Sequence, residues 1–413
     1  MRLMRGTATA AAATAAAALL LSACGSPDVR AGTAAAPRPA TAAAAPTTAA
    51  AAPAPTRRPH AVARPGAHAR HGSPSAPRRP ASRTGAAPSR TFTAGNPAGR
   101  APVPAEAAAV DTSRPTRVVG DGTPAGCTSQ AVVDAVAAGG VITFSCGPAP
   151  VTIAMKATAK VRNTSSRVVL DGGGRVTLSG GGVRRILYMN TCDQRQQWTT
   201  SHCADQAEPR LTVQNLAFAD GDATGQRTDG GGGGALFVRG GRLAIVHSRF
   251  TGNRCDATGQ DLGGAAVRVL DQYRDLPVYV SGSTFTGGRC SNGGALSSIG
   301  VSWVVLNSLM SGNAAVGHGA NPARPGTSGG GSGGAVYTDG NRYSVRIAGS
   351  VLEDNRAAEG GGAVFFVSND RSGTLRIGGS ILRRNTSAGF ETPHFPGVFF
   401  LGAGAPVVTA AAG

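Results

Sequence analysis

A repeated stretch in the C-terminal part of the chain restricts the folds open to it. Residues 361–386 read GGAVFFVSNDRSGTLRIGGSILRRNT, and residues 333–356 read GGAVYTDGNRYSVRIAGSVLEDNR. Each unit can be aligned on one large apolar residue, which gives Phe218, Phe250, Phe285, Met310, Leu352 and Leu382. Self-similarity at such a spacing is typical of solenoids and propellers, in which each unit packs on its neighbours.

Apolar residues alternate within each unit, as they do in strands. Positions −7 and −5 from the aligned residue carry Val, Ile, Leu or Trp, and position −2 carries Leu216 and then serine in every later unit. Position +3 is asparagine or glycine: Gly221, Asn253, Gly288, Asn313, Asn355 and Asn385. Position −3 holds a residue suited to tight turns: Asn215, His247, Gly282, Asn307, Gly349 and Gly379. We therefore expect two or three short strands per unit, joined by turns at fixed places.

The density of glycine and the absence of a 3.6-residue period exclude helical repeats, and a propeller would need stronger hairpin signals. We predict an all-β fold over residues 111–413: a right-handed parallel β-helix, a solenoid of one chain in which equivalent residues stack about 4.8 Å apart. Phe250 and Phe285 should stack inside it. The stretch SQAVVDAVAAGG (129–140) predicts a short amphipathic helix that caps the N-terminal end.

The first residues indicate export. Residues 1–24 combine a basic start, an apolar run and the ending Leu21-Ser22-Ala23-Cys24. This ending resembles the bacterial lipobox, which implies a signal peptide, lipidation of Cys24 and anchoring at the extracytoplasmic face of the cell membrane. The remaining six cysteines lie within the predicted domain, as expected for an exported protein.

The cysteine positions predict disulfides. Cys255 and Cys290 each lie five residues after the aligned apolar residue of their unit, so they should sit one coil apart, within bonding range. Proximity in sequence favours Cys127–Cys146 and Cys192–Cys203 for the others.

Residues 25–110 are rich in Ala, Pro, Thr, Ser and Arg and hold 11 Arg against 2 acidic residues, in a chain of net charge +18. Such a composition predicts a disordered tether. Its positive charge is equally consistent with attraction to an anionic lipid or wall polymer and with a merely solvated tail.

The stretches VVLDGGG and NLAFADG, followed by serial GGA(V/L) units, resemble the pectate-lyase-like right-handed β-helix superfamily. Within it they are most similar to polymorphic outer-membrane-protein repeats. The resemblance covers about residues 120–390 and implies the fold, whereas the repeated residues themselves are scaffold.

Function in a solenoid gathers in the loops that vary between units, here 221–233, 254–262, 314–332 and 386–397. Arg254 and Arg289 should stack in one column, with Arg356 two coils farther on. Asp256 and Asp261 lie in the neighbouring loops. These five residues are the ligand-binding candidates, because paired guanidinium groups suit an acidic polymer.

Two enzymatic alternatives remain open. A polysaccharide lyase needs a basic residue and usually Ca²⁺, for which the loop acids Asp220, Asp222, Asp229, Asp256 and Asp261 are candidates. A glycoside hydrolase needs paired carboxylates, and the tight acidic group is Glu353, Asp354 and Glu359. The sequence GHG at 317–319 is similar to one element of the polygalacturonase family, but that family's paired-Asp and Asn-x-Asp elements are missing.

Aromatic platforms for a sugar are few, namely Phe237, Tyr337 and Phe365, and His247 has a structural position in the turn column. No nucleotide loop or zinc spacing is present, and we expect no cofactor and no nucleic-acid partner. The expectation is therefore a lipid-anchored envelope protein with a binding, adhesive or structural role. Its loop ridge would contact cell-wall or extracellular acidic glycans.

Overall fold

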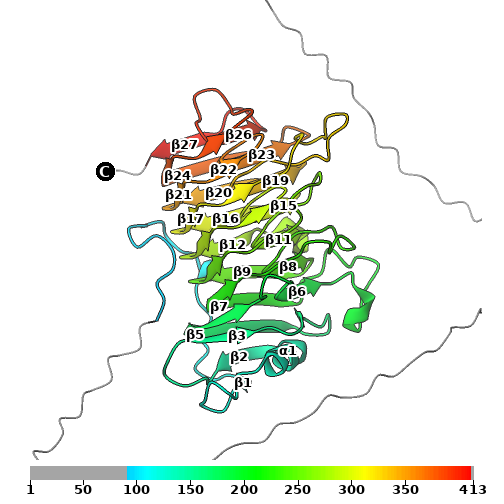
Figure 1. Cartoon of the computed structure of the whole chain (residues 1–413), viewed down its shortest axis with the longest axis vertical. Helices are drawn as coiled ribbons and strands as arrows, with labels where there is room; N and C mark the ends of the chain where they lie inside the picture. Colours follow the sequence, from blue (N-terminus) through cyan, green and yellow to red (C-terminus); the bar gives the residue numbers. More distant parts are fainter. Residues whose placement is uncertain (1–90, 411–413) are drawn as a thin grey trace, which may run out of the picture. The chain divides into compact units, whose positions relative to one another are not determined.

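A computed structural model describes residues 91–410; the predicted signal peptide, Cys24 and most of the predicted tether lie outside them. The described residues form three sheets of 15, 8 and 4 strands, and every pairing between strands is parallel. Successive coils stack from β1 to β27 (Figure 1). The predicted parallel β-helix is confirmed.

The first sheet contains β1 (Arg117–Val119), β2 (Gly140–Phe144), β3 (Val151–Ala154), β5 (Arg167–Ser179), β7 (Arg210–Ala219), β9 (Arg242–Val246), β10 (Arg249–Thr251), β12 (Val278–Ser281), β13 (Thr284–Thr286), β16 (Trp303–Leu306), β17 (Leu309–Ser311), β20 (Ser344–Ala348), β21 (Val351–Glu353), β24 (Thr374–Arg383) and β27 (Val407–Ala410). The second contains β4 (Ala159–Lys160), β6 (Leu187–Asn190), β8 (Leu236–Arg239), β11 (Val267–Leu270), β15 (Leu296–Ile299), β19 (Val336–Gly340), β23 (Val364–Ser368) and β26 (Val398–Leu401). The third contains β14 (Arg289–Cys290), β18 (Ala314–Ala315), β22 (Arg356–Ala357) and β25 (Thr386–Ser387). Short 3₁₀ turns lie at Ala105–Ala107, Gln194–Gln196 and Tyr273–Asp275.

The aligned positions of the repeat form columns inside the β-helix. Phe250 stacks between Phe218 and Phe285, with ring centroids 4.9 and 4.7 Å away, and all three rings are buried. Beside them, the backbone N–H of each serine in the −2 column donates to the hydroxyl of the next, from Ser248 to Ser380. Stacking identical residues thus pairs both their apolar surface and their polar groups.

The asparagine column at +3 is a second internal ladder. Asn313 Nδ2 donates to Asn355 Oδ1, and Asn355 Nδ2 donates to Asn385 Oδ1, each over 2.9 Å. These side chains also bond to backbone of neighbouring coils, so the buried amides are satisfied.

The expected turn column at −3 is confirmed by its backbone. All six residues have a left-handed conformation, with φ of 48° at Asn215, 44° at His247, 53° at Gly282, 50° at Asn307, 60° at Gly349 and 55° at Gly379. Asparagine and glycine tolerate this conformation best, which explains their recurrence.

The N-terminal end is covered by α1 (Ser129–Ala138), which contacts β1, β2 and β4. Thr128 caps it by accepting a bond from the Ala131 N–H, and Gly139, with φ 71°, ends it. All three predicted disulfides are present: Cys127–Cys146, Cys192–Cys203 and Cys255–Cys290, the last joining adjacent coils with Cα atoms 4.8 Å apart.

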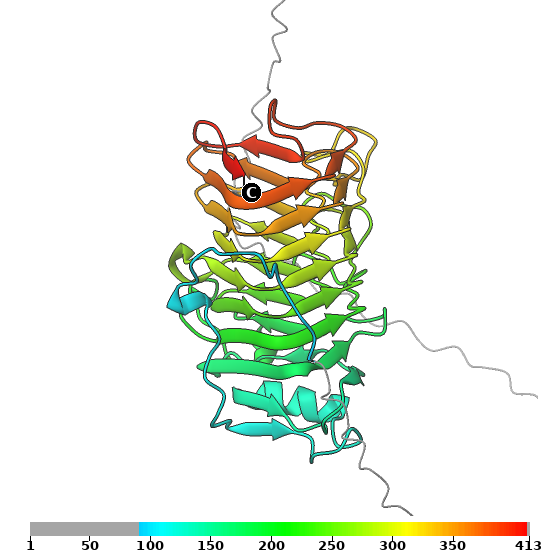
Figure 2. The same cartoon turned by 90° about the vertical axis from the view of Figure 1, so that its left-hand side faces the viewer.

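One boundary of the prediction is wrong. Residues 91–110, assigned to the disordered tether, form an ordered strap that crosses the outer face of the first sheet (Figure 2). The strap is held mainly by hydrogen bonds, including those of Asn96 and Ala101 to Asn307, and it buries only small side chains such as Ala107. A composition poor in large apolar residues can still dock where its backbone finds partners.

Candidate functional site

The expected arginine column exists on the third sheet. Arg254 pairs with Arg289 in a parallel bridge, and Arg289, Ala314 and Arg356 follow one another in register. Arg289 and Arg356 are exposed, and neither has an ion pair with any described residue. The coil assignments from sequence are therefore correct.

Arg254 faces away from Arg289. Its Nε lies 2.8 Å from Asp222 Oδ2 in the preceding coil, and its Nη2 donates to the Gly182 carbonyl. Although burial opposes it, bonds from Thr224 and Arg254 hold the pKa of Asp222 below its usual value. Arg254 is thus neutralised, and the column does not present two free guanidinium groups side by side.

The structure does not bring Asp256 and Asp261 to this column. Asp256 is buried and accepts from Arg227, with Nη2 to Oδ1 at 2.8 Å, and from the Gly225 N–H. Asp261 lies on the other side of its loop, where its Oδ1 accepts from Tyr337 Oη at 3.0 Å.

The acids considered for hydrolysis are all held in ion pairs. Glu353 and Asp354 bond to Arg383 and Arg384 on the surface. Glu359 accepts from Arg324 and from the Gly319 N–H, which, against its burial, lower its pKa; His318 Nδ1 of the GHG stretch lies 3.3 Å away. This group fastens the 317–331 loop to the coil beneath it.

A second pair of carboxylates meets at Tyr337. Its Oη lies 3.0 Å from Asp261 Oδ1 and 3.1 Å from Asp339 Oδ2. Burial, together with the charge of Asp261, raises the pKa of Asp339. The tyrosine hydroxyl thus lies between the two acids within hydrogen-bonding distance of both.

A polar groove not foreseen from the sequence follows the outer face of the second sheet. It consists of two adjoining hollows of about 300 and 460 Å³ that share Thr228 and Asp229. The loops 221–233 and 254–262 provide part of the walls, as expected of variable loops. Of the five candidate ligand-binding residues, Asp261 alone lies in the walls of these hollows.

The first hollow is basic. Lys160, Arg185 and Arg195 line it with Tyr188, against the single carboxylate of Asp229. The Lys160 Nζ lies 5.6 Å and the Arg185 Cζ 5.7 Å from the Tyr188 ring centroid. Of these three cations, Arg195 alone has an ion pair with a described residue, Asp193, at 2.9 Å.

Arg185 is fixed by backbone. Its Nε and Nη2 donate to the carbonyls of Gly233 and Gly232, and its guanidinium lies 4.9 Å from the Phe237 ring. The glycine run is required here, because a Cβ on Gly232 would collide with the Gly263 carbonyl. Burial lowers the pKa of Arg185 to about 10, so the group remains a cation.

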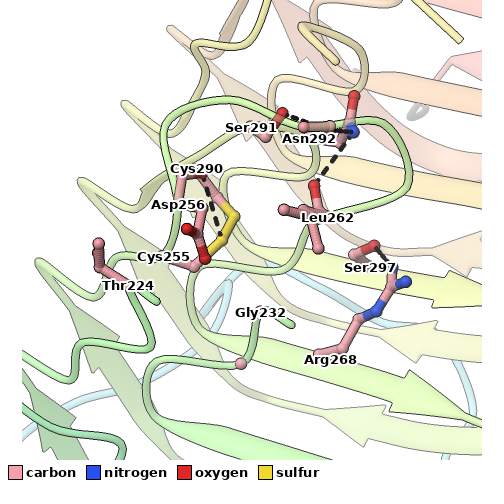
Figure 3. Close-up of a disulfide and its surroundings, with 12 residues drawn as sticks. Thr224, Gly232, Cys255, Asp256, Leu262, Arg268, Cys290, Ser291, Asn292 and Ser297 are labelled. Atoms are coloured by element: carbon pink, nitrogen blue, oxygen red, sulfur yellow. Dashed lines mark hydrogen bonds between the residues drawn. A yellow bond between two sulfur atoms is a disulfide. The ribbon is translucent and has the colours of Figure 1, made fainter. Parts of the chain in front are cut away.

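The second hollow is built around Arg268, which is only 2% exposed. Figure 3 shows the Arg268 side chain directed to Ser297 of the neighbouring coil. Its Nη1 donates to Ser297 Oγ and its Nη2 to the Asp261 carbonyl, at 2.6 Å, but its buried Nε has no partner among the described residues. No carboxylate of residues 91–410 lies within ion-pair distance of Arg268, and burial lowers the pKa of Arg268 to about 10. Arg239 and Asp271, paired at 3.2 Å, complete this wall.

Sequence reasoning missed Arg268 for a specific reason. In other coils the residue two positions after the Gly-Gly-Ala alanine faces outward, as at Phe237, Ser297 and Tyr337. Here the motif is Gly-Gly-Ala-Ala, and this one extra residue moves Arg268 into register with Phe237 and Ser297. The doubled alanine was the available signal.

Comparisons with family models, with curated proteins and with solved structures return no match to this chain. Within residues 91–410 no helix is long and apolar enough to cross a membrane. In the same range, no three His, Cys, Asp or Glu side chains are grouped so that they could hold a metal ion. The three disulfides indicate an extracytoplasmic protein.

Proposed function

We propose that this protein binds an acidic, chain-like glycan of the cell envelope in the groove along its second sheet. The observation that carries the proposal is the pair of adjoining hollows containing two buried guanidinium groups, Arg185 and Arg268, neither of which has a carboxylate partner among the described residues. Buried cations are normally paired, so the uncompensated charge of these two groups favours an anionic or hydroxyl-rich ligand in the hollows beside them.

The shape of the groove supports a chain rather than a compact ligand. Lys160, Tyr188, Phe237 and Arg268 follow one another at equivalent positions of successive strands. The walls therefore continue along the solenoid axis, and a linear polymer can contact several coils at once. Polar planar side chains such as Arg, Asp and Gln make up half of the lining residues; all three bond well to sugar hydroxyls, and Arg and Gln also donate to carboxylates.

Calorimetry on the purified full-length chain tests this proposal with two oligogalacturonates that differ only in methyl esterification. The charged form should bind and the esterified form should bind at least about tenfold more weakly, because it lacks carboxylates for the basic hollow. Lys160→Gln should weaken binding of the charged form several-fold.

Lys156→Gln is the matched control. Lys156 is the other lysine of the chain, is equally exposed and does not line either hollow. Equal effects of the two lysine substitutions, or equal binding of the two glycans, would show that net charge rather than the groove attracts the ligand.

The same samples decide the enzymatic alternative, a polysaccharide lyase or glycoside hydrolase of the pectate-lyase-like fold. A lyase generates an absorbing unsaturated product and a hydrolase generates new reducing ends. The ion-paired state of Glu353, Asp354 and Glu359 favours binding without cleavage.

The sequence also suggests where in the cell the protein binds its ligand. We infer that Cys24, in a stretch similar to the lipobox, carries the lipid that holds the β-helix at the outer face of the membrane. Cys24→Ala should move the protein from the membrane fraction to the medium. Retention of the variant in the membrane fraction contradicts lipid anchoring and leaves glycan binding unaffected.

A further inference from the structure

We propose a second ligand site, independent of the groove: an arginine-lined hollow between the strap and the first sheet that binds the anionic groups of an extended polyanion. The hollow measures about 510 Å³. Arg100 of the strap, Arg346 of β20 and Arg376 of β24 lie in its walls, and no acidic residue does.

Arg346 and Arg376 are stacked by the fold itself. They occupy partner positions of adjacent parallel strands, so their Cα atoms are about 4.8 Å apart. Both side chains are exposed, and neither has an ion pair with any residue between 91 and 410. The repulsion between two such charges is relieved by an anion that contacts both.

The strap holds the third arginine in place. Asn307 makes three hydrogen bonds to the strap. Its carbonyl accepts from the Asn96 N–H, and its side chain exchanges two bonds of 2.8 Å with the backbone of Ala101. Asn96 Nδ2 donates to the Gly349 carbonyl at 2.9 Å. The Arg100 Nη1 donates to the carbonyls of Pro97 and Gly99, so the guanidinium is tied to this ordered turn.

Another hollow between the strap and the first sheet, distinct from the two hollows of the groove, provides an internal comparison. Arg167, Arg210 and Arg242 stack there in successive strands, but Glu106 of the strap lies in its wall. The strap therefore places Glu106 beside the Arg167, Arg210 and Arg242 stack. It places Arg100 beside Arg346 and Arg376. The hollow at Arg346 concentrates positive charge without compensation.

The shape of the site favours a flexible chain over a membrane. The strap stands above the sheet on one side of the arginines, so an anion must enter the recess between the strap and the sheet. A flat bilayer surface does not enter such a recess. A polymer with phosphate or carboxylate groups at short intervals can place successive anions on Arg346 and Arg376. Bidentate pairing with guanidinium groups suits both anions.

Linear tripolyphosphate, which contains neither sugar nor lipid, is the probe. Calorimetry on the full-length chain should show binding that weakens with added salt. Arg346→Gln/Arg376→Gln should reduce the affinity at least about tenfold, because two charge-assisted contacts are lost. Arg100→Gln should reduce it less, since one contact is lost.

The control removes the same charge from another face. Arg289→Gln/Arg356→Gln neutralises two exposed arginines of the third sheet that Ala314 separates, so they do not stack on adjacent strands, and it should change the affinity by less than about twofold. Equal losses in the two double variants, or no loss at Arg346 and Arg376, overturn the proposal. Binding to phosphatidylglycerol vesicles without binding to tripolyphosphate also overturns it, in favour of a membrane surface. The Lys160→Gln variant should bind tripolyphosphate normally, so this result is separable from that of the groove.

Discussion

The inward and the outward columns of the same coils obey different rules. Inside, Phe218, Phe250 and Phe285 stack, and Asn313, Asn355 and Asn385 bond to one another, so each residue is stabilised by its own kind one coil away. Outside, the stacked arginines repel, and the partners that relieve the repulsion come from elsewhere in the chain. Asp222 serves Arg254, whereas no described residue pairs with Arg346 or Arg376.

This difference decides what each column can be used for. A column that satisfies itself belongs to the scaffold, whereas a column that needs a partner of opposite charge has unused binding capacity wherever the chain does not supply that partner. Under the two binding proposals above, the inward columns of the solenoid serve stability and the outward columns serve recognition.

The largest expected effect is in the inward column. Phe250→Ala removes the ring between two stacked neighbours and should lower the free energy of unfolding by about 3–5 kcal/mol. Phe250→Leu, which keeps most of the volume, should cost less. Chemical denaturation measures both, and a loss below about 1 kcal/mol for the alanine variant would mean that the column is not part of the core.

The columns of the repeat could be predicted from the sequence because each depends on the residue at one repeated position. The Phe, Ser, Asn and turn columns were all identified in this way, as was the Cys255–Cys290 bond between coils. The groove was missed, since it depends on a single departure from the repeat, the doubled alanine before Arg268, and on the hydrogen bonds of Arg185 to Gly232 and Gly233, which no repeated position indicates. The strap escaped prediction because hydrogen bonds, which composition does not reveal, hold it.

A smaller effect is expected in the asparagine ladder. Asn355→Ala removes the acceptor for Asn313 and the donor to Met310 and Asn385, so several buried groups lose a partner. The free energy of unfolding should fall by about 1–3 kcal/mol. The control is Asn341→Ala, at an exposed position, which should change it by less than about 0.5 kcal/mol. Equal changes in the free energy of unfolding for the two variants would mean that the hydrogen bonds of the asparagine ladder do not stabilise the fold.

The smallest effect compares two neighbours in the outward column. Arg254→Gln leaves Asp222 without its ion-pair partner and should lower the free energy of unfolding by about 0.2–1 kcal/mol, because the pair is partly exposed. Arg289→Gln removes a charge that has no ion-pair partner in the described part of the chain and should leave stability unchanged or slightly higher. A double-mutant cycle with Asp222→Asn isolates the pair from other changes.

The coupling energy between Arg254 and Asp222 should decrease as salt is added. It should also fade in acid: the pKa of Asp222 is lower in the folded protein than its ordinary 3.8, so the contribution is fully present above that value and is lost as the pH falls through the folded pKa. If Arg254→Gln and Arg289→Gln lowered the free energy of unfolding equally, the ion pair with Asp222 would not explain the expected difference between them.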